Sequence, residues 1–277
     1  MDILEIKDLE ILAQKRVPKM FFDYANSGSW SETTYRENVT DFQKIKLRQR
    51  VAVDMSNRTL ETKMVGQKVS MPVALAPTGL TGMQHADGEI LAAQAAEEFG
   101  IPFTLSTMSV CSIEAVAEKT KKPFWFQLYI MRDRKFMERL IDRAKAAKCS
   151  ALVLTLDLQI LGQRHKDVRN GLSTPPKFTP KHLYQVLTRP RWCLKMLGTK
   201  NYFFGNIVGH VEGIKDVRSL TSWVGTQFDP QLNWKDIEWI KKRWGGKLII
   251  KGILDSDDAK MAVNTGADAI IVSNHGG

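Results

Sequence analysis

The chain has 277 residues, 43% of them hydrophobic, which suits one large globular domain with a sizeable core. Its 40 Lys and Arg outnumber its 30 Asp and Glu, and the formal net charge of +10 indicates an anionic partner. No apolar run reaches about 18 residues, and residues 1–19 carry charges throughout, so we expect neither a bilayer-spanning helix nor a secretory leader.

The cysteines Cys111, Cys149 and Cys193 are few and lie far apart. This pattern indicates a reducing cytosol and argues against a disulfide framework or a Cys-x-x-Cys metal site. We therefore expect no metal.

Residues 1–70 precede the first expected strand. They are predicted to form helices, one that opens at Pro18 and one near Ser31, followed by an extended stretch to Ser70.

Short β-rich apolar runs then alternate with amphipathic stretches. The predicted strands are Pro72–Ala76, Pro102–Leu105, Phe124–Leu128, Ala151–Leu156, Lys247–Ile250 and Ala269–Val272. The predicted helices are Gly88–Glu98, Ser112–Lys119, Arg134–Ala147, Trp234–Arg243 and Ser256–Thr265, with Ser112 and Ser256 as N-caps and Gly100 and Gly266 at C-caps. This alternation predicts a parallel sheet with helical crossovers.

Polar residues follow nearly every strand, which is typical of a (β/α)₈ barrel, whose site is built at the carboxyl ends of the strands. A doubly wound sheet is the alternative, but no Gly-x-Gly-x-x-Gly follows the first strand. We predict an α/β fold, a (β/α)₈ TIM barrel with an N-terminal helical extension. The chain covers about six of its eight βα units, so we expect residues 1–277 to form a single, C-terminally incomplete domain.

A long insertion, residues 159–231, interrupts the repeat. Between Lys177 and Arg218 it holds eight Lys and Arg against two acidic residues, interleaved with Leu, Tyr and Trp. Such a pattern favours a helix at an anionic membrane surface. A solvated loop that closes over the site is the alternative, and nucleic acid is disfavoured because no recognition fold accompanies the cations.

Several stretches together resemble a known family closely, in order and spacing over essentially the whole chain. They are FFDYANSGSW (21–30), MPVALAPTGLTGM (71–83), PFTLSTMSVCSIE (102–114), PFWFQLY (123–129), LVLTLDLQILGQRHKDVRNG (152–171), KLIIKGILDSDDA (247–259) and GADAIIVSNHGG (266–277). The sequence resembles the FMN-dependent 2-hydroxy acid dehydrogenases and oxidases, and within them the bacterial respiratory L-lactate dehydrogenase branch.

The resemblance implies the catalytic residues His275, Asp157 and Tyr129. His275 would be the base, because imidazole titrates near neutrality, and Asp157 would stabilise its protonated form. Tyr24, Tyr129 and Arg164 would bind the substrate, with Arg164 on its carboxylate. Without the resemblance these are a structural histidine, a loop cap, a loop cation and core aromatics.

The cofactor implied is FMN. Lys251 would stabilise negative charge on the reduced flavin. The full set of flavin-binding residues would be Pro77, Thr78, Gly79, Ser106, Gln127, Thr155, Lys251 and Ser273.

The activity implied is oxidation of L-lactate to pyruvate, with electrons passed to quinone or a cytochrome. The enzyme would be a homo-oligomer, a tetramer by family, held peripherally at the cytoplasmic face of the inner membrane. The alternatives are a soluble 2-hydroxy acid oxidase that produces hydrogen peroxide and an inactive truncated remnant.

Overall fold

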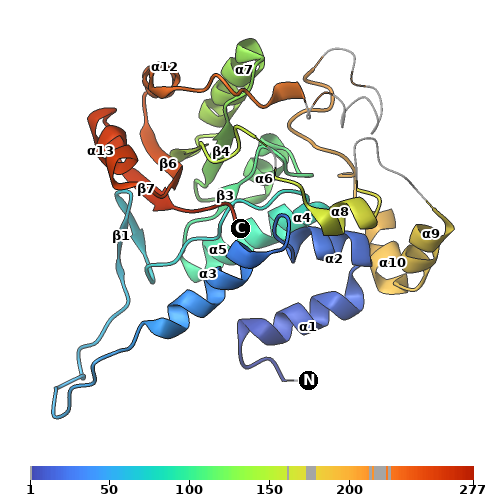
Figure 1. The fold of residues 1–277 in the computed structure, drawn as a ribbon, viewed down its shortest axis with the longest axis horizontal. Helices are drawn as coiled ribbons and strands as arrows, with labels where there is room; N and C mark the ends of the chain where they lie inside the picture. Colours follow the sequence, from blue (N-terminus) through green and yellow to red (C-terminus); the bar gives the residue numbers. More distant parts are fainter. Residues whose placement is uncertain (1, 161, 173–178, 212–213, 215–222, 224–225) are drawn as a thin grey trace.

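The structure is a computed structural model that describes residues 2–160, 162–172, 179–211, 214, 223 and 226–277 (Figure 1). Its strands are β1 (Thr62–Met64), β2 (Gln67–Val69), β3 (Thr104–Leu105), β4 (Trp125–Tyr129), β5 (Ala151–Thr155), β6 (Lys247–Ile253) and β7 (Ala269–Val272). Its helices are α1 (Ile6–Arg16), α2 (Lys19–Ala25), α3 (Thr33–Lys44), α4 (Thr81–Gln84), α5 (Gly88–Phe99), α6 (Ile113–Lys119), α7 (Arg134–Ala146), α8 (His165–Arg169), α9 (Pro180–Leu187), α10 (Pro190–Gly198), α12 (Trp234–Trp244) and α13 (Ser256–Asn264).

The main sheet is parallel and has five strands in the order β3-β4-β5-β6-β7. Each strand pairs with the one that follows it in sequence, so the order never reverses. A doubly wound sheet reverses its strand order, whereas a barrel winds in one direction. The topology therefore excludes the doubly wound alternative and confirms the predicted parallel α/β arrangement.

The two faces of the sheet differ. One face packs against the helices, where Phe126, Leu152 and Ile250 join Phe136 and Leu140 of α7 in the main core. On the opposite, inner face, a smaller cluster of Trp125, Ala151, Val153 and Ile249 packs against Met64 and Val65 of the β1–β2 hairpin. The hairpin thus covers the apolar amino-terminal half of the inner face and leaves the carboxyl half for polar residues.

Strand register aligns those polar residues. Tyr129 pairs with Thr155, and Thr155 with Lys251, so three neighbouring strands present them side by side. Alternation along a strand also puts Gln127 on the face that Tyr129 occupies.

The structure corrects several predicted elements. Residues 72–76 form no strand, and only Leu75 makes a parallel bridge, to Phe103. Pro72 and Pro77 lack the N–H that a ladder requires, which explains the difference. Strand β6 runs to Ile253, so Lys251 lies within it and does not end it.

The helix boundaries also differ in detail. Ser112 caps α6 as expected, accepting the Ala115 N–H at 3.1 Å, whereas α13 is capped by Asp255 and Ser256 is its first residue. The sequence does not predict helix α1, and the extended stretch predicted before Ser70 ends in the β1–β2 hairpin. No helix among the described residues is long and apolar enough to cross a bilayer.

The insertion contributes α8, α9 and α10, the last two adjacent at one side of the molecule (Figure 1). Lys177, Lys215 and Arg218 of its basic segment lie outside the described residues. Cys111, Cys149 and Cys193 are free thiols, and burial raises the pKa of Cys149 to about 12.

Candidate active site

The loop after β7 brings His275 to Asp157. His275 Nδ1 lies 2.7 Å from Oδ1 of Asp157, which follows β5 by two residues. Because a carboxylate only accepts, Nδ1 carries the hydrogen, and in the neutral imidazole Nε2 presents a lone pair. His275 has a φ of 62°, and its backbone N–H donates to Ser273 Oγ at 3.1 Å. This is the arrangement of an oriented general base.

A buried cation lies beside this pair. Lys251 is 9% exposed, and its Nζ donates to Ser273 Oγ at 3.0 Å and lies 3.7 Å from Asp157 Oδ2. Burial lowers the pKa of Lys251, and the charge of Asp157 opposes that shift. Lys251, Asp157, Ser273 and His275, four residues of the expected site, are therefore brought together.

A row of hydrogen bonds links the preceding strands. Gln127 Nε2 donates to Thr155 Oγ1 at 3.0 Å, and Gln127 Oε1 accepts from Ser106 Oγ and from the Thr107 N–H, both at 3.2 Å. All four residues are buried. The contacts fix the amide of Gln127, so the predicted polar residues of β4 and β5 form one ordered row.

The two tyrosines remain phenols. The ring centroid of Tyr129 lies 6.3 Å from that of His275. Burial raises the pKa of Tyr129, and Tyr24 and Asp157 add to the shift. Burial also raises the pKa of Tyr24, although Arg164 opposes it. Both hydroxyls therefore stay protonated at neutral pH and are available as donors.

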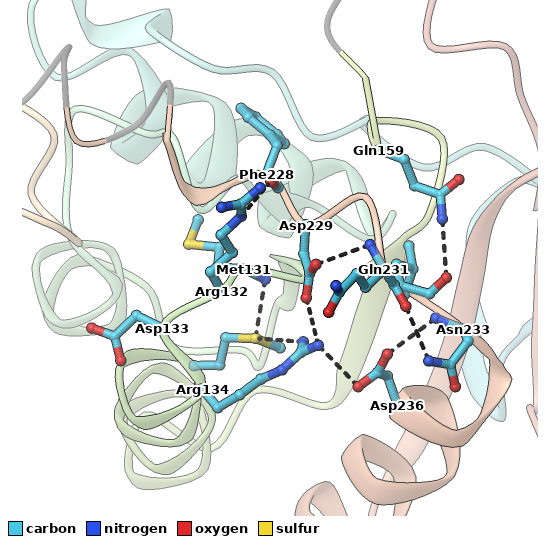
Figure 2. A network of polar contacts seen from close by, with 12 residues as sticks. Met131, Arg132, Asp133, Arg134, Gln159, Phe228, Asp229, Gln231, Asn233 and Asp236 are labelled. Atoms are coloured by element: carbon cyan, nitrogen blue, oxygen red, sulfur yellow. Dashed lines mark hydrogen bonds and ion pairs between the residues drawn. The ribbon is translucent and has the colours of Figure 1, made fainter.

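An aromatic residue that the sequence did not single out covers Tyr129. The Phe228 ring packs edge-on against it, with centroids 6.0 Å apart. Figure 2 shows how this segment is held: Arg132 Nε donates to the Phe228 carbonyl at 3.3 Å, and Gln159 Nε2 donates to the Leu232 carbonyl at 3.1 Å.

The same segment is tied to α7 and α12 by charge. Arg134 lies 2.8 Å from Asp229 Oδ2 and 3.0 Å from Asp236 Oδ1 (Figure 2). Met131 and Phe228 also form an antiparallel bridge. These contacts place part of the insertion against the carboxyl end of β4.

Arg164, at the start of α8, is held between that helix and the end of α2. It donates to the Tyr24 carbonyl and, at 2.8 Å, to Ser27 Oγ, while its Nε lies 2.7 Å from Asp167 Oδ2. Its guanidinium carbon lies 5.0 Å from the Tyr24 ring centroid. Tyr24 and Arg164 thus form one unit, and within the described residues no hydrogen bond or ion pair joins Arg164 to the His275–Asp157 pair.

The predicted loop Pro77–Gly79 lies against this unit. A Cβ at Gly79 would lie 2.9 Å from Tyr24 Oη and 3.4 Å from Met108 Cβ, so only glycine leaves that space free. Thr78 is exposed, and its hydroxyl lies 3.5 Å from the Ala76 carbonyl.

Gly252 is a further site residue that was missed. Its φ is 103°, and a Cβ there would lie 2.7 Å from Asp157 Cβ. A glycine inside a β-rich run signals a bulge or a close approach, and the β6–β7 register shifts between Lys251 and Ile253. That signal was present in the sequence, whereas none marks Phe228, Ser27 or Asp167.

Comparisons with known proteins agree on one family. A family model described as FMN-dependent dehydrogenase matches residues 13–277. The L-lactate dehydrogenase of Acinetobacter baylyi is 47% identical over 279 residues, covering 100% of this chain and 72% of that protein.

Solved structures give the same result. The monotopic membrane protein (S)-mandelate dehydrogenase matches with a TM-score of 0.92 at 32% identity, over 99% of this chain and 73% of that one. Mandelate oxidase with (S)-4-hydroxymandelic acid matches with a TM-score of 0.80 at 30% identity, over 98% and 70%.

Proposed function

The chain belongs to the FMN-dependent dehydrogenase family, and from that premise we propose that it oxidises L-lactate to pyruvate and passes the electrons to quinone or a cytochrome. Its cofactor is FMN, its fold is that of a (β/α)₈ barrel and its activity is that of a 2-hydroxy acid oxidoreductase. The contact of His275 Nδ1 with Asp157 Oδ1 at 2.7 Å is the observation that carries the proposed chemistry.

The residues present fit a flavin. Ser106, Gln127, Thr155 and Lys251 line up on the inner face as buried donors and acceptors, the kind of row that matches the polar edge of an isoalloxazine. Lys251 would stabilise negative charge at N1 and the C2 carbonyl, and Ser273 holds its ammonium. Pro77, Thr78 and Gly79 would lie along the ring. When bound, FMN accepts the two electrons that leave the substrate carbon.

His275 takes a proton from the substrate. Asp157 keeps the hydrogen on Nδ1, so Nε2 is free to accept, and the carboxylate then stabilises the imidazolium that forms. Lys251 lies on the other side of the carboxylate, with its Nζ 3.7 Å from Asp157 Oδ2.

The substrate carboxylate would be held by phenols and a guanidinium. Tyr129 and Tyr24 are protonated donors because burial raises the pKa of each. Arg164 supplies positive charge at the Tyr24 ring, and Asp167 and Ser27 fix its position. Such prior ordering lowers the entropy lost on binding.

Helices α9 and α10 of the insertion would bind the membrane surface. Helices α9 and α10 expose Leu183, Tyr184, Leu187, Leu194 and Leu197. Beside Lys181, Arg191 and Lys195, this surface suits binding at a lipid interface. We place the enzyme peripherally at the cytoplasmic face of the inner membrane, as a homo-oligomer, and light scattering in detergent tests the tetramer that the family resemblance implies.

Steady-state kinetics on the FMN-loaded protein test the proposed reaction. We expect kcat/KM to be highest for L-lactate among L-lactate, D-lactate, glycolate and (S)-mandelate, with a soluble quinone as acceptor. Pyruvate should form in equal amount to the quinone reduced, with little oxygen consumed.

The rival functions give distinct results. Stoichiometric hydrogen peroxide would instead identify a soluble oxidase, and preference for (S)-mandelate would contradict the substrate. A colourless protein that fails to retain FMN would contradict the enzymatic assignment altogether.

A further inference from the structure

A second cavity, lined by cationic and aromatic side chains, lies apart from the site described above. It has a volume of about 280 Å³ and is lined by Arg16, His85, Ala86, Arg191, Trp192 and Lys195. These residues come from the end of α1, the turn after α4 and helix α10. The lining holds three cationic side chains and a histidine, without a carboxylate, and none of its residues belongs to the candidate active site.

Hydrogen bonds order part of the lining of this cavity. Lys195 Nζ lies 2.8 Å from His85 Nε2, and His85 Nδ1 lies 2.8 Å from the Ala86 carbonyl. The carbonyl can only accept, so Nδ1 carries the hydrogen and Nε2 accepts from the ammonium. One ammonium donor is thereby committed and the others remain free to face a ligand.

Trp192 forms an ordered wall. Its Nε1 donates to the Met83 carbonyl at 2.9 Å, and its ring stacks on Phe21 with centroids 5.7 Å apart. The wall joins α10 to the N-terminal helices, so the cations of α1 and α10 are held at one opening.

The positive charge at this opening is not neutralised within the described part of the chain. No carboxylate lies within 4.0 Å of Arg16, Arg191 or Lys195, whereas many other cations of the protein have such partners, for example Arg134 and Lys247. Cations gathered without acidic neighbours repel one another, and a bound anion removes that cost.

We propose that the cavity of Arg16, His85, Arg191 and Lys195 is a binding site for a phosphate group. Two guanidinium groups and an ammonium match the several oxygens of a phosphate, because Arg donates bidentately and Lys adds a point charge. The phosphate would belong either to an anionic phospholipid or to a soluble phosphate compound. The exposed Leu194 and Leu197 of the same helix place the opening at the surface where a lipid headgroup would lie.

Two binding measurements on the FMN-loaded full chain separate the sources. Equilibrium dialysis with radiolabelled inorganic phosphate tests the soluble form. Co-sedimentation with vesicles of phosphatidylcholine, with or without an equal amount of phosphatidylglycerol, tests the lipid form. We expect Arg16→Gln and Arg191→Gln each to weaken binding of phosphate or of the anionic vesicles by roughly tenfold or more. Each variant loses a charge-assisted hydrogen bond to the phosphate group.

Lys200→Gln is the matched control. Lys200 is exposed, follows α10 and does not line the cavity, so its loss removes the same charge from the same segment. Diffuse attraction to an anionic surface predicts that it costs as much as Arg16→Gln, about fivefold. If the cavity is the binding site, Lys200→Gln should leave inorganic phosphate binding unchanged and should reduce vesicle binding less than Arg16→Gln does.

Every outcome decides the proposal. If Arg16→Gln and Arg191→Gln lose inorganic phosphate binding and Lys200→Gln keeps it, the cavity is a site for soluble phosphates. Loss restricted to phosphatidylglycerol vesicles supports a headgroup site. Equal effects of Arg16→Gln and Lys200→Gln, or no binding in either measurement, would overturn it, and circular dichroism of each variant confirms that the fold is intact.

Discussion

The pair of His275 and Asp157 depends on backbone that only certain residues tolerate. His275 has a φ of 62°, and Gly252, which faces Asp157, has a φ of 103°. The pair is held by Ser273 on one side and by the close approach of β6 on the other. Under the proposed mechanism, a base that is fixed in this way would lose little orientation entropy when it reacts.

Asp157→Asn tests the role of the carboxylate. The amide of Asn can donate to Nδ1, which puts the hydrogen on Nε2 and removes the lone pair that takes the substrate proton. We expect kcat with L-lactate to fall by roughly 10²–10⁴-fold while visible absorbance shows FMN retained. Asp255→Asn, which only changes the cap of α13, should leave kcat unchanged. Equal kcat in the two variants would contradict the proposed pair.

Gly252→Ala tests the close approach of β6 to Asp157. A left-handed alanine costs about 1–2 kcal/mol, and the overlap of its Cβ with Asp157 adds about 1–3 kcal/mol. Gly266→Ala is the control, because Gly266 has a φ of 75° but no atom within 4 Å of a built Cβ. Urea unfolding should show a clearly larger loss for Gly252→Ala, together with reduced kcat. An equal loss of unfolding free energy in both variants would mean that the contact of Gly252 with Asp157 is not the cause.

The sequence could predict residues whose position follows from strand order. Gln127, Thr155 and Lys251 end up in one row because register and alternation determine it. Phe228 and Asp167 reach the site through the folding of the insertion, which no periodicity describes. The partners of Arg164 were not predictable for the same reason, because Ser27 follows α2 and Asp167 lies on α8.

At the scale of elements, burial decided what was predictable. The strands β4, β5 and β6 are buried, and their short apolar runs of β-branched and aromatic residues predict strands. Helix α1 buries no residue completely and gave no comparable signal. The segment 72–76 has strand-like composition, but its flanking prolines decided against a ladder.

Arg134→Gln tests the link between α7, α12 and the Phe228 segment. The change removes a cation between two carboxylates, so we expect the free energy of unfolding to fall by about 1–3 kcal/mol. KM should rise as well, because Phe228 packs on Tyr129. Lys260→Gln, in an ion pair whose side chains are 75% and 82% exposed, should cost less than about 0.5 kcal/mol. A matching loss in both variants, measured by urea unfolding, would argue against the link.

Glu114→Gln tests the contact of α6 with α7 through pH. Arg143 pairs with both oxygens of Glu114 and lowers the pKa of that carboxyl from 4.5 to about 2, against burial. The folded state therefore gains stability above the unfolded pKa and loses it as pH falls from 4.5 toward 2. Because Glu114 is half exposed, we expect the variant to lose at most about 1 kcal/mol at neutral pH.

The pH dependence of that difference is the decisive measurement. Unfolding in urea at neutral pH and at the lowest pH where both proteins stay folded should show the gap between wild type and Glu114→Gln narrow. A gap that stays constant with pH would mean that the carboxylate charge is not its source.

At the scale of the whole molecule, the inner face of the sheet and the α9–α10 surface serve different purposes. The strand ends gather buried polar side chains, whereas α9 and α10 expose apolar ones beside cations. The proposed transfer of electrons to quinone would need both, because quinone is confined to the membrane. The surface of α9 and α10 should therefore contribute to membrane binding and not to the chemical step.

The double variant Leu194→Ser/Leu197→Ser tests that division. The two side chains are 70% and 79% exposed, so replacing them costs the fold little, while each leucine withdrawn from a lipid interface costs about 1–3 kcal/mol of membrane binding. We expect co-sedimentation with phosphatidylcholine vesicles to weaken at least roughly tenfold, with kcat toward a soluble quinone unchanged. Leu47→Ser/Leu254→Ser, which changes two exposed leucines elsewhere, should bind vesicles like the wild type. If both double variants sediment alike, α9 and α10 are not the membrane contact, and the exposed leucines need another partner.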